Sequence, residues 1–148
     1  MSLENLAAIS QLERISPDAG DIARLLEAAA RSLSDARLPG LSAEGRFDMA
    51  YKAVMQTANT ALQANGYRTL TSKPGHHATM IQTLPMTVGL DKTSMVVLDA
   101  LRKQRNVIDY SGELVSDAMA AEAVARAEAL IGKVREWLAE NKPELLQR

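Results

Sequence analysis

The sequence predicts an all-α fold, an antiparallel bundle of four main helices with short accessory helices. Alanine is abundant, aromatic residues make up only 3% of the 148 residues, and long β-branched runs are absent. This composition favours closely packed helices over a sheet. Apolar residues recur at spacings of three and four along several segments joined by short connections, which is typical of an antiparallel bundle. We therefore expect a single helical domain over residues 1–148.

Two helices are expected in the first part of the chain. Residues 1–16 begin with Ser2, a favourable helix cap, and end before Pro17, so an N-terminal accessory helix is predicted there. The next helix ends at the Leu-Pro-Gly turn of residues 38–40. Its apolar stripe consists of Ile22, Leu25, Leu26, Ala29 and Leu33.

The strongest helix signal covers residues 41–66. Ser42 is placed to cap it, and Gly66 is placed to stop it. Its continuous apolar face consists of Phe47, Ala50, Tyr51, Val54, Ala58, Ala61 and Leu62. Residues 67–77 are predicted to follow as a loop, because Pro74 and Gly75 break regular structure.

The second half of the chain is predicted to hold one short helix and two long ones. The short helix covers residues 77–85 and ends or kinks near Pro85, and the first long helix covers residues 92–109. Ser116 caps the last helix, which ends before Pro143. Its inward face consists of Val124, Ala127, Leu130, Ile131, Val134 and Leu138. No segment has a convincing strand pattern.

Charge and composition exclude several classes of site. The 17 basic and 18 acidic residues give a net charge of −1, so any nucleic-acid or lipid contact needs a local patch. The chain has no cysteine and only two adjacent histidines, so we expect no metal and no cofactor. No apolar stretch approaches the ~18 residues of a membrane span, and the N-terminus lacks the basic region of a signal peptide. We therefore expect a bacterial-type cytoplasmic protein without a membrane association.

Residues 102–110, RKQRNVIDY, place charged side chains on an apolar helical stripe. At about 100° per residue, Arg105 projects between Leu98 and Leu101. One interpretation is structural, with Arg105 buried and paired with Asp109 four residues on, or with groups across a dimer. The other is a site that holds an anion.

Two further features bear on the anion site. His76 and His77 lie at the start of the short helix, where one of them could cap the helix or bind a phosphate. In the alternative interpretation neither binds a ligand, and one is a loop histidine while the other is half-buried. Basic residues form a local cleft if the loop of residues 67–77 packs near the end of the helix of residues 92–109, and are otherwise scattered. These residues are Arg68, Lys73, Arg102, Lys103 and Arg105.

The order and spacing of these motifs resemble the HEPN domain family (higher eukaryotes and prokaryotes nucleotide-binding). In that family an Arg and a small polar residue precede a His by four to six residues late in a bundle helix. Arg105 and Asn106 match the pair, whereas Tyr110 stands where the His is expected, as in a branch of small bacterial proteins with an Arg-x-x-x-Asp-Tyr ending.

Other segments share this resemblance, which covers about residues 18–140. The stretch RFDMAYKAVMQTANTALQANGYRT, residues 46–69, is similar to the family's helix with an Ala-Tyr pair and an Ala-rich face. His77 resembles a His often found after the loop that follows. The resemblance implies a homodimer, and the Ala- and Met-rich faces suit the packing of a second bundle.

Catalytic HEPN proteins resemble metal-independent ribonucleases, in which the ribose 2′-OH attacks the adjacent phosphate. The resemblance implies that Arg105 holds the phosphate through two hydrogen bonds. The family's His would move the proton. A tyrosine such as Tyr110 is a poor base at neutral pH, although it can donate a hydrogen bond or stack on a nucleobase. The presence of Tyr110 in place of the family's His therefore argues against nuclease activity.

Three functions stay open at this point. The first is a non-catalytic, dimeric nucleotide- or RNA-binding protein that partners a minimal nucleotidyltransferase in a toxin–antitoxin-type system. The second is a metal-independent HEPN ribonuclease with Arg105 and Tyr110 as catalytic candidates. The third is a helical-bundle dimerisation adaptor without a ligand. The residues expected to bind nucleotide or RNA are Arg105, Asn106, Tyr110, Arg102 and His77.

Overall fold

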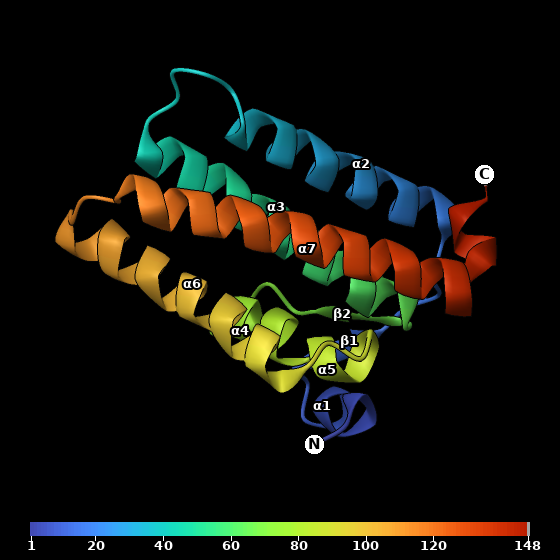
Figure 1. The fold of residues 1–148 in the computed structure, drawn as a ribbon. Helices are drawn as coiled ribbons and strands as arrows, with labels where there is room; N and C mark the ends of the chain where they lie inside the picture. The colour runs from blue at the N-terminus through green and yellow to red at the C-terminus, as the bar shows by residue number, and fades with distance from the viewer. Residues whose placement is uncertain (148) are drawn as a thin grey trace.

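Four long helices form the body of the molecule (Figure 1). They are α2 (Ala19–Ala36), α3 (Ala43–Ala64), α6 (Lys92–Ser111) and α7 (Asp117–Asn141). The computed structural model describes residues 1–147. In this part of the chain the predicted all-α bundle is confirmed, and long helices that follow one another run antiparallel (Figure 1).

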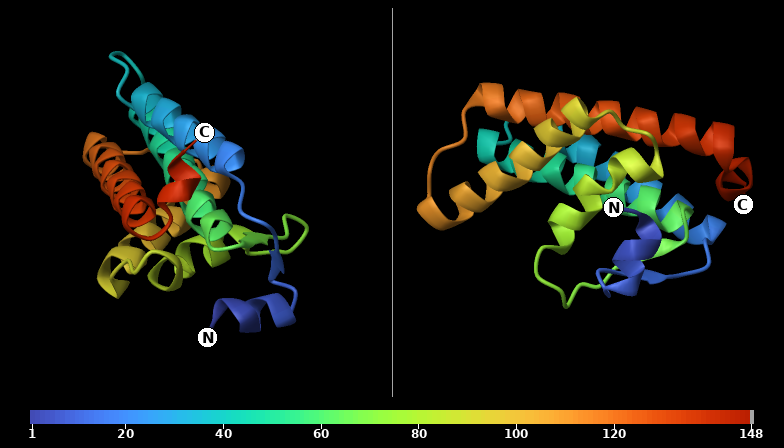
Figure 2. Two further views of the ribbon diagram at one scale, coloured as in Figure 1. Left: turned by 90° about the vertical axis from the view of Figure 1, so that its right-hand side faces the viewer. Right: turned by 90° about the horizontal axis from the view of Figure 1, so that it is seen from below.

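Short elements flank this body (Figure 2). They are α1 (Leu3–Ala8), β1 (Leu12–Arg14), β2 (Tyr67–Thr69), α4 (His76–Gln82), α5 (Leu84–Thr87) and the 3₁₀ helix η1 (Pro143–Leu146). Thr83 separates α4 from α5, so the short helix expected to end or kink near Pro85 is two helices. None of the described helices is long and apolar enough to cross a membrane.

The strands β1 and β2 correct two expectations. The accessory helix predicted over residues 1–16 ends at Ala8, and the chain then turns through Ser10, whose φ is 61°. Residues 67–69, expected in a loop, pair with β1 antiparallel, with Leu12 opposite Thr69. Leu12 and Thr69 are buried, and Arg68 forms an ion pair with Glu13 across the ladder. This small sheet depends on contacts between distant segments and has no local signature.

Serine and aspartate caps begin the long helices. Ser42 accepts a hydrogen bond from the Gly45 N–H at 3.0 Å, and Ser116 accepts one from Met119 at 3.1 Å. Both caps were predicted, and each satisfies an N–H group that has no partner within its helix.

Helix α3 is the centre of the core. It packs most extensively against α2 and α7 and also contacts α4, α5 and α6. Its small residues Ala50, Ala53, Ala58 and Ala61 are fully buried, which lets the neighbouring helices approach closely. The predicted apolar faces are confirmed, although Leu25 and Val124 are only half-buried at the edges of their stripes. Core side chains that test these faces include Val54, Leu62, Leu101 and Leu130, all buried.

Candidate functional site

A pocket of about 350 Å³ opens between α3, α4 and α6. Helix α6 contributes Arg105 and helix α4 contributes His77, two of the residues that the sequence singled out. The remaining wall comes from α3. Its lining residues there are Asp48, Met49, Tyr51, Lys52, Met55 and Gln56.

Arg105 reaches from α6 towards α3. Its Nε lies 3.9 Å from Oδ1 of Asp48, and its guanidinium carbon lies 5.0 Å from the centre of the Tyr51 ring. The first distance is too long for a hydrogen bond, and the second is a cation–π contact. The Nε is buried and finds no hydrogen-bond partner among residues 1–147. Arg105 therefore keeps hydrogen-bond donors for a further acceptor.

This placement corrects the structural interpretation of Arg105. Within residues 1–147 its ion pair is with Asp48 on α3 and not with Asp109. The side chain is 35% exposed, so it is half-buried rather than largely buried. The aromatic face of Tyr51 attracts the Arg105 guanidinium towards α3. The sequence pattern of α6 alone does not reveal this contact with another helix.

Tyr51 and His77 form a hydrogen-bonded pair beside Arg105. The Tyr51 hydroxyl lies 3.1 Å from Nδ1 of His77. Burial raises the pKa of Tyr51 to about 12, against the opposing effect of the nearby arginines, so the phenol keeps its proton at neutral pH. Burial also lowers the pKa of His77, and the positive charges of His76, Arg105 and Arg102 act in the same direction. His77 is therefore neutral at pH 7.

A neutral His77 has two tautomers in this pair. When the Tyr51 hydroxyl donates to Nδ1, Nε2 carries the ring proton and is a donor. When Nδ1–H donates to the Tyr51 oxygen, Nε2 has a free lone pair and can accept a proton. The pair can thus either donate a hydrogen bond to a ligand or act as a base.

Asp48 is the acidic member of the pocket. Burial raises the pKa of this carboxyl group, Arg105 lowers it, and Asp109 raises it further. A carboxylate here competes with any anion for Arg105. Because its pKa is raised, Asp48 is neutralised at a higher pH than an exposed aspartate.

Arg102 is occupied by a structural contact close to the pocket. Its Nε donates to Oδ1 of Asp99 at 2.8 Å, and Lys103 lies 3.7 Å from the other carboxylate oxygen. The Asp99 hydrogen bond raises the pKa of Arg102. Burial acts to raise the pKa of Asp99, but the hydrogen bond and charge of Arg102 lower it overall. Arg102 thus affects His77 through its charge and does not line the pocket.

Asn106 and Tyr110 do not line the pocket either. Both are exposed, and Tyr110 has 92% of its surface accessible. Tyr110 follows Arg105 by five residues, which is about 140° around a helix. The residues grouped by their closeness in sequence therefore point to different sides of α6.

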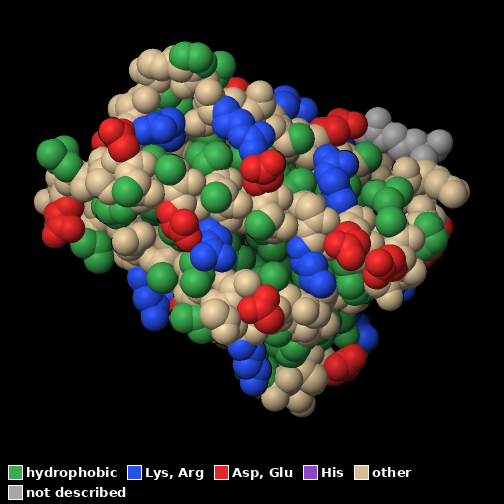
Figure 3. Space-filling view, in the orientation of Figure 1, with side chains coloured by type: hydrophobic (Ala, Val, Ile, Leu, Met, Phe, Trp, Pro, Cys, Tyr) green, Lys and Arg blue, Asp and Glu red, His purple; other side chains and the backbone are tan. Residues whose placement is uncertain are grey.

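The basic cleft expected from five residues does not form around this pocket. Of the five, only Arg105 lines it. Arg68 is held by Glu13 on the small sheet, and Arg102 by Asp99. Basic and acidic side chains are interspersed over the face seen in Figure 3.

Sequence reasoning missed the contribution of α3. Asp48, Lys52 and Gln56 recur every four residues beside the apolar face of this helix, and all three line the pocket. Tyr51 was assigned to the core, where it does lie, but its hydroxyl reaches the pocket. A polar row at the edge of a buried helix was the signal that could have been used.

No family model, curated protein or solved structure matches this chain. Within residues 1–147 there is also no group of three or more histidine, cysteine, aspartate or glutamate residues that could hold a metal ion. The arrangement of Arg105, Tyr51, His77 and Asp48 is therefore the basis for inferring a function.

Proposed function

We propose that this protein binds the phosphate group of a nucleotide or of RNA at the Arg105 pocket, without efficient cleavage. The observation that carries the proposal is the partly exposed guanidinium of Arg105 in the pocket wall, whose contact with Asp48 at 3.9 Å is too long for a hydrogen bond. A guanidinium group presents paired N–H donors that match two oxygens of a phosphate. A phosphate in the pocket would supply acceptors for the exposed part of this group.

The other lining residues support a phosphate site of modest affinity. Lys52 adds a second positive charge, and His77 can donate through Nε2. Asp48 opposes binding because its carboxylate lies near Arg105. A phosphate must therefore compete with Asp48, and weak binding follows.

The HEPN resemblance extends this proposal to a homodimeric, cytoplasmic partner of a minimal nucleotidyltransferase in a toxin–antitoxin-type system. An exposed apolar surface at the end of α6 supports the dimer. Val107, Tyr110 and Leu114 are all large and exposed there. A second copy that covers this surface would remove apolar area from water.

A metal-independent HEPN ribonuclease is the second candidate, and the Tyr51–His77 pair favours it. In the tautomer with Nδ1–H, Nε2 of His77 can take the proton of a ribose 2′-OH as its oxygen attacks the phosphorus held by Arg105. The leaving 5′-oxygen must then receive a proton. Among residues 1–147, His77 is the only imidazole that lines the pocket, and the carboxylate of Asp48 competes there with the phosphate for Arg105. Without a second imidazole to protonate the leaving oxygen, a contribution of about 10²–10⁴-fold to the rate is lost, so non-catalytic binding is preferred.

The test measures affinity for a labelled single-stranded RNA by fluorescence anisotropy, and for UMP by calorimetry. Arg105→Ala should weaken both by about tenfold or more, as expected for the loss of a charge-assisted contact. Arg126→Ala is the matched control, since Arg126 is also ion-paired and has a similar exposure of 39% against 35%. Equal affinity of the native protein and Arg105→Ala would contradict the proposal, and no binding at all would favour the ligand-free adaptor.

A further inference from the structure

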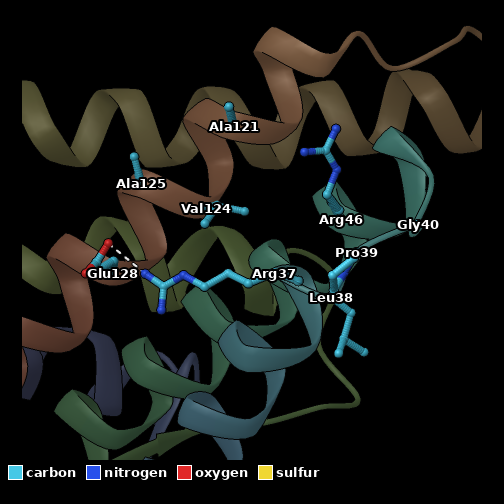
Figure 4. A pocket seen from close by; sticks show the side chains of 10 residues that line it. Arg37, Leu38, Pro39, Gly40, Arg46, Ala121, Val124, Ala125 and Glu128 are labelled. Atoms are coloured by element: carbon cyan, nitrogen blue, oxygen red, sulfur yellow. Dashed lines mark ion pairs between the residues drawn. The ribbon is translucent and has the colours of Figure 1, made fainter.

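A second pocket, of about 480 Å³, lies between the loop after α2 and the first half of α7 (Figure 4). It shares no residue with the Arg105 pocket. Its lining residues are Ala36, Arg37, Leu38, Pro39, Gly40, Arg46, Ala121, Val124, Ala125 and Glu128.

The local sequence explains why this region is hollow. Helix α2 ends at Ala36, and the chain turns away through Pro39 and Gly40, whose φ of 83° favours glycine. The loop projects beyond the ends of the helices (Figure 1). Opposite it, α7 presents the small side chains of Ala121 and Ala125. Small residues facing a diverging loop leave an open space with an apolar floor.

Two arginines lie on either side of Val124 in this pocket (Figure 4). Arg37 is bound to Glu128 at 2.7 Å, and Arg46 is bound to Asp117 at 2.7 Å. These carboxylates are eleven positions apart on α7, which is about 16 Å along a helix. The two guanidinium groups therefore cannot share one small anion, and each must be considered alone.

Arg46 is the guanidinium that lacks a full set of acceptors. Its side chain is 29% exposed, and its Nε is buried with no hydrogen-bond partner in the described part of the chain. Its ion-pair partner, Asp117, is 91% exposed, so water competes strongly for this carboxylate. The exposed part of the Arg46 side chain lines the pocket, so an anion there can compete with Asp117 for the guanidinium group.

We propose that this pocket binds a small organic anion through Arg46, with a carboxylate or phosphate at the guanidinium and an apolar body against Val124 and the neighbouring alanines. The oxyanion binds the exposed part of the Arg46 guanidinium group and replaces the weak contact with the exposed Asp117. Glu128 lines the pocket away from Arg46 and is paired with Arg37, so Arg46 is the arginine available to an anion there. This site is independent of the function proposed for Arg105.

Two-dimensional NMR of the full chain tests the site. Phenyl phosphate and benzoate carry the same apolar ring on different anions, benzyl alcohol lacks the charge, and inorganic phosphate lacks the ring. Saturable shifts of the Arg46, Val124 and Ala125 amides with the two aromatic anions, and weaker or no shifts with the two controls, are expected. Arg46→Gln should weaken binding about tenfold or more, whereas Arg24→Gln, at another arginine paired with a first-turn aspartate, should leave it unchanged.

Asp117→Asn provides a second test, because tighter anion binding in this variant is not expected if Arg46 has only a structural role. Removing the competing carboxylate should tighten binding of both aromatic anions by about two- to fivefold, the range expected for an exposed ion pair. Asp21→Asn is the matched control, because Asp21 is also an acidic first-turn residue paired with an arginine. The proposal is overturned if native protein shows no saturable shift at Val124, if a folded Arg46→Gln keeps native affinity, or if Asp117→Asn fails to tighten binding.

Discussion

The hydroxyl of Tyr51 lies 3.1 Å from Nδ1 of His77, and this contact joins α3 to α4 in the wall of the Arg105 pocket. The same Tyr51 ring lies under the guanidinium of Arg105. One side chain therefore positions both the neutral imidazole and the cation.

Tyr51→Phe should leave the fold intact and reduce the free energy of unfolding by about 0.5–1.5 kcal/mol, the usual net contribution of one hydrogen bond. The ring of phenylalanine still packs in the core and under Arg105. Tyr51→Ala also removes the ring and should cost about 3–5 kcal/mol. Urea denaturation measures the stability of both variants, and a Tyr51→Phe variant as stable as the native protein would show that the hydroxyl contact is unimportant.

His77 should make the folded state less stable in mild acid. Its folded pKa is lowered from 6.5 by burial, so the unfolded chain binds more protons between the folded value and 6.5. The free energy of unfolding should therefore fall as the pH drops from 7.5 through this window. His77→Gln should show a smaller decrease than the native protein in urea denaturation at pH 7.5 and 5.5. The charge of His76 also lowers the His77 pKa, so His76→Gln should reduce the pH dependence less than His77→Gln does. An unchanged pH dependence in His77→Gln would count against the buried imidazole.

Asp48→Asn should tighten the binding of RNA and UMP to the pocket. The change removes the carboxylate that competes for Arg105 while it keeps a side chain of similar size. Asp35→Asn, on the exposed face of α2, changes the net charge equally and should have little effect on affinity. Weaker binding by Asp48→Asn would mean that Asp48 positions Arg105 rather than competing with the ligand.

Because α3 is closely packed, replacing one of its buried alanines by a larger residue should lower the free energy of unfolding. Ala58 is fully buried, so Ala58→Leu forces neighbouring helices apart and should destabilise the protein by about 1–3 kcal/mol or more. Ala139→Leu on the exposed face of α7 should change stability by less than about 0.5 kcal/mol. Thermal and urea unfolding measure both, and a well-tolerated Ala58→Leu would contradict the central place given to α3.

The exposed end of α6 should mediate self-association. Replacing Tyr110 and Leu114 together by serine removes the two most exposed large apolar side chains beyond the first residue. Native protein should sediment as a dimer at tens of micromolar and the double variant as a monomer, because a stable interface buries about 1,200–2,000 Å². Replacing the exposed Leu38 and Leu41 by serine is the control. A monomeric native protein would contradict the dimer.

The sequence was sufficient for the helices because their signals are local. Ser42 and Ser116 cap the helices that they were predicted to cap, and the apolar stripes are the buried faces. The small sheet could not be predicted, because Leu12 pairs with Thr69 across 57 positions of sequence and neither strand has a local signature.

The candidate site was predicted only in part, for a similar reason. Arg105 and His77 were recognised as residues, but their meeting depends on how α4 and α6 pack around α3. Tyr110 was grouped with Arg105 by sequence spacing, and helix rotation separates them. Tyr51 carries an apolar ring and a polar hydroxyl, so periodicity assigned it to the core and did not reveal its contact with His77.

The most direct measurement of the phosphate-binding proposal is the side-chain Nε–Hε resonance of Arg105 during a titration with UMP. If a phosphate binds the exposed part of the Arg105 guanidinium group, the neighbouring Hε resonance should move in a saturable way, and with the same affinity that calorimetry gives. The resonance of Arg126, already bonded to Glu122, should stay in place. The account would be contradicted if UMP did not bind. It would also be contradicted if UMP bound without moving the Arg105 resonance.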